Sequence, residues 1–286
     1  MRVIVFGAGG MLGHDLVAVA PKEALLFPTS HSELDIADYK AVTAYVTKVQ
    51  PDLIINAAAY TAVDRAESER ELAFKVNCEA VGALGKVAAP ARVKVVHFST
   101  DYVFDGTGLG AYVEESETSP VNAYGATKLA GEIALRESGA DTLIIRTQWL
   151  FGGKGRSFPR TMWERAVQEL PTKVVNDQTG RPTYTVDLAE ATWRLVQAGT
   201  EGLVHIANSG STSWYGLASH VFHLAGKPNL VTSCSTADYP TAARRPPNSV
   251  LSTLAAEARL GYRLPDWRHA VERFITSAFG KAVANL

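Results

Sequence analysis

The 286-residue chain contains only two cysteines, Cys78 and Cys234, and they stand far apart. Two thiols at that separation give neither a disulfide framework nor a metal-binding spacing, so we assign them no function. Long apolar runs are also missing, because no stretch approaches the roughly 18 consecutive apolar residues of a membrane span. These absences exclude a disulfide scaffold and predict no membrane partner.

An excess of charge of one sign is absent as well. The sequence has 28 basic and 29 acidic residues and a formal net charge of −1. Such a balance gives no global attraction to nucleic acid, so we expect no nucleic-acid partner. The chain starts with a strand pattern instead of a basic and apolar signal segment, which predicts a cytoplasmic protein.

Short apolar runs alternate with longer segments of helical period through the first half of the chain. The intervals between the runs are too long for hairpins, and this rhythm is typical of βαβ units. We therefore predict an α/β fold with a doubly wound, Rossmann-like parallel sheet. The expected strands are Val3–Phe6, Ala24–Phe27, Leu53–Ile55, Val93–Phe98 and Leu143–Ile145, and the expected helices include 39–49 and 69–89.

The pattern loosens after Arg146, where glycine-rich and proline-rich loops separate a helical segment at 158–170 from strand-like runs at 173–175 and 203–207. We expect residues 1–147 plus about 173–207 to form a dinucleotide-binding Rossmann domain. Residues from about 148 to 172 plus 208–286 would form a smaller, discontinuous substrate-binding lobe. Such a lobe would cover a ligand at the carboxyl ends of the strands.

A glycine-rich turn follows the first predicted strand directly, as Gly7-Ala-Gly-Gly10-Met-Leu-Gly13. Its G-x-x-G-x-x-G spacing differs from the more familiar G-x-G-x-x-G, although Gly9 lets the first part imitate it. Free N–H groups at the start of the following helix would favour a pyrophosphate. A plain connection between strand and helix is the competing interpretation, since glycine serves many turns.

Hydroxyl, phenol and ammonium groups follow later strands. Ser99-Thr100-Asp101-Tyr102 ends an apolar run, and Tyr124 and Lys128 stand four positions apart on a predicted helix, hence on one face. An exposed surface pair is the alternative. However, the carboxyl ends of parallel strands meet at one edge, where a neighbouring ammonium would lower the pKa of a phenol. This convergence predicts a nicotinamide-dependent reductase.

These motifs, together with Asn56-Ala-Ala-Ala-Tyr-Thr-Ala-Val-Asp64, resemble the extended short-chain dehydrogenase/reductase family. Within it, the closer resemblance is to the family of dTDP-4-dehydrorhamnose reductases. The resemblance extends over almost the whole chain. It continues through Arg146–Trp149, Asn176–Thr183, Ser213–Tyr215 and Arg244–Pro246.

The resemblance implies a reaction and a catalytic set. Hydride would pass from NADPH or NADH to the C4 ketone of dTDP-4-dehydro-β-L-rhamnose, giving dTDP-β-L-rhamnose. Tyr124 would donate the proton to the sugar oxygen, and Lys128 would bind the nicotinamide ribose and tune Tyr124. Thr100 would hydrogen-bond the substrate carbonyl. The partner is thus a dTDP-linked 4-keto-6-deoxy sugar.

The resemblance also implies cofactor contacts. Asp35 would accept a hydrogen bond from the adenine amine, although a helix cap for the segment near Asp38 is the alternative. No acidic residue stands in Phe27–Ser30 to repel a 2′-phosphate, and His31 and Arg2 lie nearby, so NADPH should be tolerated and NADH is not excluded. The full cofactor set is Gly7, Gly10, Met11, Leu12, Gly13, Asp35, Ile36, Ala58, Ala59, Tyr60, Tyr124 and Lys128.

For the sugar nucleotide, the resemblance implies contacts from Thr100, Asp101 and Trp149, with Arg244 or Arg245 on the diphosphate. A core tryptophan and a solvated arginine loop are the competing interpretations. Asp177, Gln178 and Trp214 belong to the family pattern, but we derive no contact for them.

Two other functions use the same fold. A sugar-nucleotide dehydratase would need an Asp-Glu pair after Thr100, and here Tyr102 follows Asp101. A non-catalytic, nucleotide-sensing regulatory subunit would not need the intact Thr100, Tyr124 and Lys128. Some family members form dimers through a carboxylate-bound magnesium ion. The tail Lys281–Leu286 has no acidic residue, so we expect no metal and leave a homodimer open.

Overall fold

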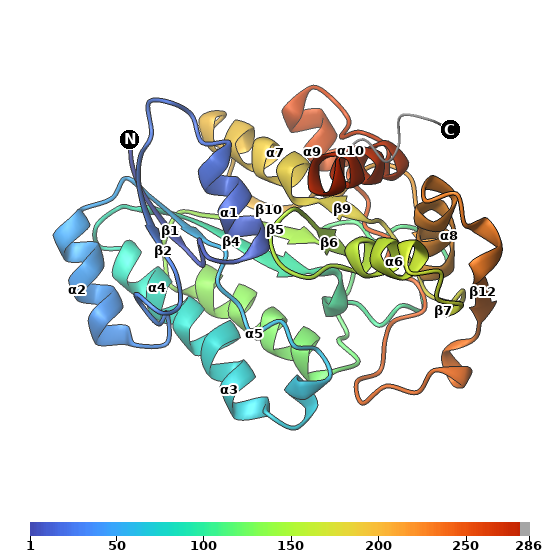
Figure 1. The fold of residues 1–286 in the computed structure, drawn as a ribbon. Coiled ribbons are helices and arrows are strands. Elements are labelled where there is room, and N and C mark those ends of the chain that lie inside the picture. Colours follow the sequence, from blue (N-terminus) through green and yellow to red (C-terminus); the bar gives the residue numbers. More distant parts are fainter. Residues whose placement is uncertain (281–286) are drawn as a thin grey trace.

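A central parallel sheet organises the protein, which we describe from a computed structural model of residues 1–280. Its six strands run in the order β10-β5-β4-β3-β1-β2, and every neighbouring pair is parallel. This arrangement confirms the predicted doubly wound α/β fold (Figure 1). The strands are β1 (Arg2–Phe6), β2 (Leu25–Thr29), β3 (Leu53–Asn56), β4 (Lys94–Thr100), β5 (Thr142–Thr147) and β10 (Gly202–His205).

Helices cover both faces of the sheet (Figure 1). One face carries α1 (Met11–Ala18), α7 (Thr185–Gln197) and α9 (Leu254–Leu260), and the other carries α2 (Tyr39–Val49), α4 (Ala80–Ala88) and α5 (Ala123–Glu137). Burial on both faces explains why the strands are nearly continuous apolar runs in the sequence.

The predicted helix over 69–89 is interrupted. It consists of α3 (Arg70–Phe74), the π-helical turn η2 (Lys75–Glu79) and α4, preceded by the short η1 (Arg65–Glu67). The wide turn directs Asn77 toward α5, where its Nδ2 donates to Oγ1 of Thr127 at 3.1 Å. α5 approaches closely because a Cβ on Gly131 would lie 2.0 Å from the carbonyl oxygen of Asn77.

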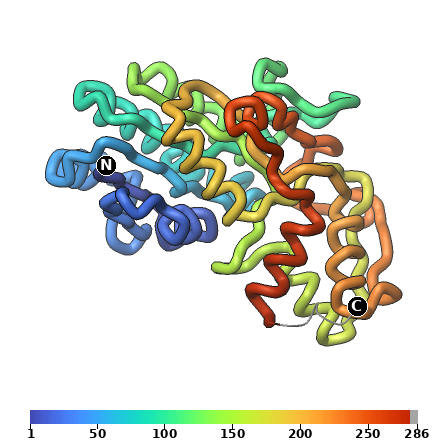
Figure 2. Tube along the Cα trace, turned by 90° about the horizontal axis from the view of Figure 1, so that it is seen from above, coloured from blue at the N-terminus to red at the C-terminus, as the bar shows by residue number. Residues whose placement is uncertain are grey.

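A second hydrophobic core is formed by buried side chains of helices that are grouped to one side of the central sheet in Figure 2. It joins α6 (Phe158–Val167), α8 (Trp214–Leu224) and α10 (Trp267–Phe279), and we call this part the lobe. Its short elements are β6 (Leu150–Phe151) paired with β9 (Thr183–Tyr184), β7 (Thr172–Val175) with β12 (Val231–Cys234), and β8 (Thr179–Gly180) with β11 (Thr212–Ser213), plus η4 (Pro228–Leu230) and η5 (Thr236–Asp238).

Two elements lie elsewhere than the sequence pattern indicated. The strand expected at 173–175, which we assigned with the Rossmann segment, is β7, and it pairs with β12 instead of the central sheet. In contrast, α9 was expected in the lobe, but its Ala256 is buried in the hydrophobic core between the central sheet and the helices α1 and α7. We call this core the first core. Short apolar runs do not specify which partner they pair with.

Among residues 1–280, no helix is both long and apolar enough to cross a membrane.

Candidate active site

The glycine turn after β1 is shaped by close backbone packing. Gly7 has a φ of +75°, and a Cβ there would lie 2.6 Å from the amide nitrogen of Ala58. A Cβ on Gly13 would lie 2.1 Å from the carbonyl oxygen of Gly7. The turn therefore tolerates no side chain at either position, and Gly10 caps the start of α1.

Beside this turn is a depression of about 630 Å³, which we call the glycine-turn cleft. Most of the predicted cofactor residues line it, whereas Met11 and Leu12 line the adjoining cavity and Gly13 lines neither. The predicted residues in the cleft are Gly7, Gly10, Asp35, Ile36, Ala58, Ala59 and Tyr60.

The structure shows which charged residues near the cleft could contact a cofactor. Asp38, not Asp35, caps α2 by accepting from the amide of Ala41 at 3.0 Å. Arg2 lies at the opposite end of β1, where its Nε donates to the carbonyl of Val49 at 2.8 Å, so it is not near a cofactor phosphate. Glu33 folds back to accept from the Ser30 hydroxyl at 2.6 Å, which lowers the pKa of that carboxyl.

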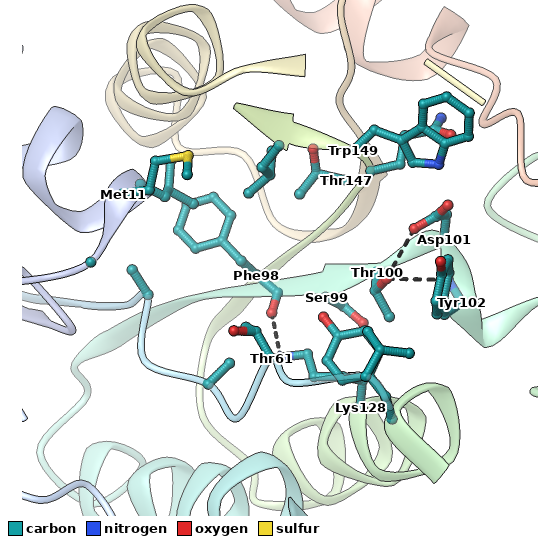
Figure 3. Close-up of a pocket in the computed structure, with 18 of the residues that line it drawn as sticks. Met11, Thr61, Phe98, Ser99, Thr100, Asp101, Tyr102, Lys128, Thr147 and Trp149 are labelled. Atoms are coloured by element: carbon teal, nitrogen blue, oxygen red, sulfur yellow. Dashed lines mark hydrogen bonds between the residues drawn. The ribbon is translucent and has the colours of Figure 1, made fainter. Parts of the chain in front are cut away.

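A cavity of about 550 Å³ lies at the carboxyl ends of β3, β4 and β5, and we call it the central cavity (Figure 3). Thr100, Asp101, Tyr124, Lys128 and Trp149 all line it, so the structure brings the predicted catalytic residues together. Residues 57–59 line both this cavity and the glycine-turn cleft, so the two spaces adjoin.

Local packing places the start of α5 beside this cavity. The side chain of Asn122 caps the helix by accepting from the amide of Gly125 at 2.8 Å. A Cβ on Gly125 would lie 2.1 Å from the carbonyl oxygen of Tyr102, in the short η3 (Asp101–Val103). Close contact with η3 thus brings the first turn of α5 against the end of β4.

Lys128 is almost completely buried, with 1% of its surface exposed. Its Nζ donates to the carbonyl of Phe98 at 2.6 Å and lies 3.2 Å from Nε2 of His97. Burial lowers the pKa of Lys128 to about 8, and the charge of Glu132 opposes the shift. The ammonium can therefore release its proton near neutral pH.

Desolvation in the cavity raises the pKa of Tyr124 to about 12, while hydrogen bonding with Thr100 opposes the shift and the charge of Asp101 adds to it. The sequence argument expected a neighbouring ammonium to lower this pKa. That expectation is wrong, because desolvation dominates and the ammonium of Lys128 contacts Phe98 and His97 instead of the phenol.

Asp101 is buried beside Thr100, whose hydroxyl donates to Oδ1 of the carboxyl at 3.0 Å. The other oxygen, Oδ2, has no hydrogen-bond partner among the described residues. Burial raises the pKa of Asp101 to about 7, and the hydrogen bond from Thr100 opposes the shift. The cavity therefore holds a buried carboxyl whose pKa lies well above its ordinary value.

Two tryptophans form an apolar wall of the central cavity. The rings of Trp149 and Trp214 stack with centroids 3.6 Å apart and planes 7° apart. Trp149 has a φ of +49°, an uncommon backbone conformation for a bulky residue, and a Cβ on Gly180 would lie 2.5 Å from its ring. Trp149 thus lines the cavity and is also packed, partly buried, against the core of the lobe.

A third space of about 620 Å³, the lobe cavity, lies between η3 and the lobe. Tyr102 and Trp214 line both it and the central cavity. Arg245 lines the lobe cavity and makes two hydrogen bonds to Asp64, at 2.6 and 2.7 Å. Arg244 is exposed and lines none of the three spaces, so of the two candidate arginines only Arg245 is placed to meet a ligand there.

Trp214 is one of the three residues for which the sequence predicts no contact, and the structure also locates the other two, Asp177 and Gln178. Gln178 lines the lobe cavity and donates to the hydroxyl of Thr236 at 2.9 Å, and Asp177 accepts from the amide of Thr236.

Sequence reasoning missed several polar residues at the strand ends. Their signal was present, because a polar residue that closes an apolar strand faces the ligand edge of a parallel sheet. Within residues 1–280, no group of three or more His, Cys, Asp or Glu side chains could hold a metal, and the tail at 281–286 lies outside the described residues. The missed residues that line the central cavity are Asn56, Thr147 and Gln148, and Ser99, which the sequence motif included without a role, lines it as well.

Comparisons with known proteins agree over the whole chain. Residues 1–279 match the family model described as RmlD substrate binding domain. The chain is 41% identical to dTDP-4-dehydrorhamnose reductase of Burkholderia thailandensis, over 95% of this chain and 97% of the relative. It is 40% identical to the reductase of Escherichia coli, over 98% of each.

Solved structures give the same family. The dTDP-4-dehydrorhamnose reductase of Bacillus anthracis, in complex with NADP, is 35% identical with a TM-score of 0.93, over 96% of this chain and 99% of that one. A UDP-glucose 4-epimerase of Thermus thermophilus, at 22% identity and a TM-score of 0.82, covers 99% of this chain and 100% of its own, and shares the fold.

Proposed function

Because the chain belongs to the family of dTDP-4-dehydrorhamnose reductases, which are NAD(P)H-dependent oxidoreductases, we propose that it reduces dTDP-4-dehydro-β-L-rhamnose at C4 to dTDP-β-L-rhamnose. The observation that carries the proposal is the convergence of Thr100, Tyr124 and Lys128 in one cavity that adjoins the glycine-turn cleft. A regulatory subunit without activity would not require this convergence.

The glycine-turn cleft fits a dinucleotide. Side chains are excluded at Gly7 and Gly13, so a pyrophosphate can approach the backbone at the start of α1. Ala58 and Ala59 would leave room for the ribose, and Asp35 and Ile36 would lie against the adenine. The bound nicotinamide supplies the hydride. The NADP complex of the Bacillus anthracis relative supports NADPH here, and NADH remains a second candidate.

In the proposed chemistry, the hydroxyl of Tyr124 donates a proton to the C4 oxygen of the sugar as that oxygen gains negative charge. Its raised pKa keeps the phenol protonated before the reaction. The Thr100 hydroxyl would bond the same oxygen, and Lys128 would hold the nicotinamide ribose and return a proton toward Tyr124. Positioning these donors beside a desolvated ketone supplies most of the protein's contribution.

The lobe would hold the rest of the substrate. We propose that Trp149 and Trp214 contact the apolar side of the deoxysugar and that the lobe cavity receives the dTDP portion. Arg245 would bond the diphosphate, because its guanidinium lines this cavity. Asp101 would meet a sugar hydroxyl through Oδ2, which is buried with no partner among the described residues.

The test is turnover. Purified protein is mixed with NADPH and a panel of 4-keto sugar nucleotides, and nicotinamide absorbance is followed. We expect dTDP-4-dehydro-β-L-rhamnose to be reduced, and Tyr124→Phe to lose about 10²- to 10⁴-fold in kcat while NADPH binding is retained.

Tyr262→Phe serves as a matched control, since Tyr262 packs against the first core, outside the three cavities. It should keep wild-type kcat. An undiminished rate in Tyr124→Phe would refute the acid assignment. Tight NADPH binding without turnover of any 4-keto sugar would favour the regulatory alternative.

A further inference from the structure

Three polar side chains are buried together between the sheet and α5. Asn56 ends β3 and His97 lies beside it on β4, as direct partners in the parallel register. Lys128 reaches them from α5. None of the three exposes more than 1% of its surface, so water does not satisfy their hydrogen bonds and their donors and acceptors must match one another.

The amide orientation of Asn56 is determined by the backbone. Its Oδ1 accepts from the amide of Ala58 at 3.0 Å, so its Nδ2 faces Nδ1 of His97 at 3.1 Å. An amide NH₂ group only donates, and therefore Nδ1 of His97 must accept. Burial, with the charge of Lys128 adding, lowers the pKa of His97 well below its ordinary value, so the ring is neutral and carries its proton on Nε2.

This tautomer has a consequence for Lys128. The Nε2–H group of His97 faces Nζ at 3.2 Å, while Nζ itself donates to the carbonyl of Phe98. An amine can accept the Nε2–H bond through its lone pair, but an ammonium has no lone pair and would oppose one donor with another. The pair of contacts therefore favours the neutral amine.

We propose that Asn56 and His97 are positioning residues that make Lys128 a ready proton donor: Asn56 holds His97 in the Nε2–H tautomer, and His97 stabilises the amine that remains after proton release. This inference rests on the proposed function, in which Lys128 returns a proton toward Tyr124. When Lys128 has given up this proton, its side chain is the neutral amine that His97 stabilises.

Other groups around Lys128 do not replace this effect. Glu132, one turn further along α5, is bonded to Arg146 on β5. Asp101 hydrogen-bonds Thr100 at the other end of the cavity. Of the charges on α5 itself, Glu132 raises the pKa of Lys128. The titratable and charged groups on the elements packed against α5 are Lys94 and His97 on β4, Arg146 on β5, Asp101 and Tyr102 on η3, Lys75, Cys78 and Glu79 on η2, Lys86 on α4, Arg70 and Glu71 on α3, and Arg65 and Glu67 on η1.

A tautomer measurement on the intact protein tests the first half of the proposal. Nitrogen-15 NMR of histidine-labelled protein separates protonated from unprotonated ring nitrogens, and His97→Gln identifies the His97 signals by their loss. We expect wild-type His97 to carry hydrogen on Nε2 at pH 7. Hydrogen on Nδ1 would overturn the proposal, whether or not the protein turns over.

Substitutions at Asn56 test the second half. Asn56→Asp keeps the acceptor for Ala58 but turns the group facing His97 into an acceptor, and Asn56→Leu removes the donor without adding charge. Both should move the hydrogen of His97 to Nδ1, so that Nε2 accepts from an ammonium. The alkaline limb of the kcat profile should then rise by about one pH unit, with the larger shift in Asn56→Asp.

Asn208→Leu is the matched control, because Asn208 is also fully buried after a strand of the same sheet and its Oδ1 accepts from the amide of Tyr184 at 2.8 Å. It should leave the His97 tautomer and the alkaline limb in place. An unmoved limb in both Asn56 variants, in an enzyme that Tyr124→Phe inactivates, would overturn this inference and leave the proposed function standing. A shift in Asn56→Asp alone would show an effect of charge and contradict the tautomer argument.

Discussion

Two buried cations lie under α5, and they differ in what surrounds them. The guanidinium of Arg146 makes two hydrogen bonds to the carboxylate of Glu132, at 2.9 and 2.7 Å. Lys128 lies on α5, one turn before Glu132, and contacts the Phe98 carbonyl and the His97 ring. None of the ion pairs in residues 1–280 includes it. A paired cation is a fixed part of the structure, whereas a cation with neutral partners carries a removable proton.

The comparison is sharpened by a buried histidine beside each cation. Nε2 of His205 lies 3.5 Å from Nη1 of Arg146, and Nε2 of His97 lies 3.2 Å from Nζ of Lys128. Burial lowers the pKa of His205 to about 3 and that of His97 well below its ordinary value. Both rings are neutral at pH 7, so neither histidine adds a second charge beside its cation. An arginine retains its proton in proteins, whereas the pKa of a lysine falls readily on burial.

The largest expected effect is on kcat when Lys128, the cation with the removable proton, is replaced. Lys128→Met should reduce kcat by about 10²- to 10⁴-fold, because the proton path to Tyr124 is removed. The folded structure should persist, since methionine fills a similar volume without a buried charge. Steady-state kinetics with circular dichroism measures both. Wild-type kcat in a folded Lys128→Met protein would contradict the claim that Lys128, unlike Arg146, supplies a proton.

Replacing Arg146, the cation paired with Glu132, is expected to affect the stability of the protein. Arg146→Met should destabilise the protein by about 3–5 kcal/mol, because it leaves the carboxylate of Glu132 buried without its partner. Urea unfolding gives this value. In a double-mutant cycle, Glu132→Gln combined with Arg146→Met should cost less than the sum of the two single changes. Additive losses would mean that the two side chains are not coupled.

A smaller effect is expected in the dependence of stability on pH. The pKa of Lys128 falls from an ordinary 10.5 to about 8 in the folded protein. Between these values the unfolded chain binds more protons, so wild-type stability should rise as pH increases through this window. Lys128→Met should be more stable than wild type by roughly 1–3 kcal/mol below pH 8, and the advantage should disappear toward pH 10. A constant difference would contradict the shifted pKa.

Asp101 extends the comparison to an acid with neutral partners. Its pKa rises from an ordinary 3.8 to about 7, so the folded protein binds more protons between these values. Stability should therefore be greatest near pH 4 for this group and fall as pH rises to 7. Asp101→Asn should remove part of that fall, on the order of 1 kcal/mol, in thermal unfolding followed across pH. Parallel pH profiles for the two proteins would count against a buried ionisable carboxyl.

Local signals predicted much of the fold and of the site. The glycine turn and the residues that end β4 and begin α5 were predictable, because a parallel sheet brings strand ends to one edge. The relation of Asn56 to His97 depends on the register of two strands, and the sequence does not contain that register explicitly. The orientation of Lys128, and with it the pKa of Tyr124, depends on the same packing. The choice between Arg244 and Arg245 depends on the conformation of a loop.

The most direct test of the account is the titration of Lys128 itself. Carbon-13 NMR of the lysine Cε signals, followed across pH, reports the pKa of each lysine, and Lys128→Met assigns the signal of interest. We predict one lysine that titrates at about pH 8 in wild type and whose signal is absent from Lys128→Met. If every lysine titrated near its ordinary value, at about pH 10.4, Lys128 would carry a fixed charge and the distinction from Arg146 would fail.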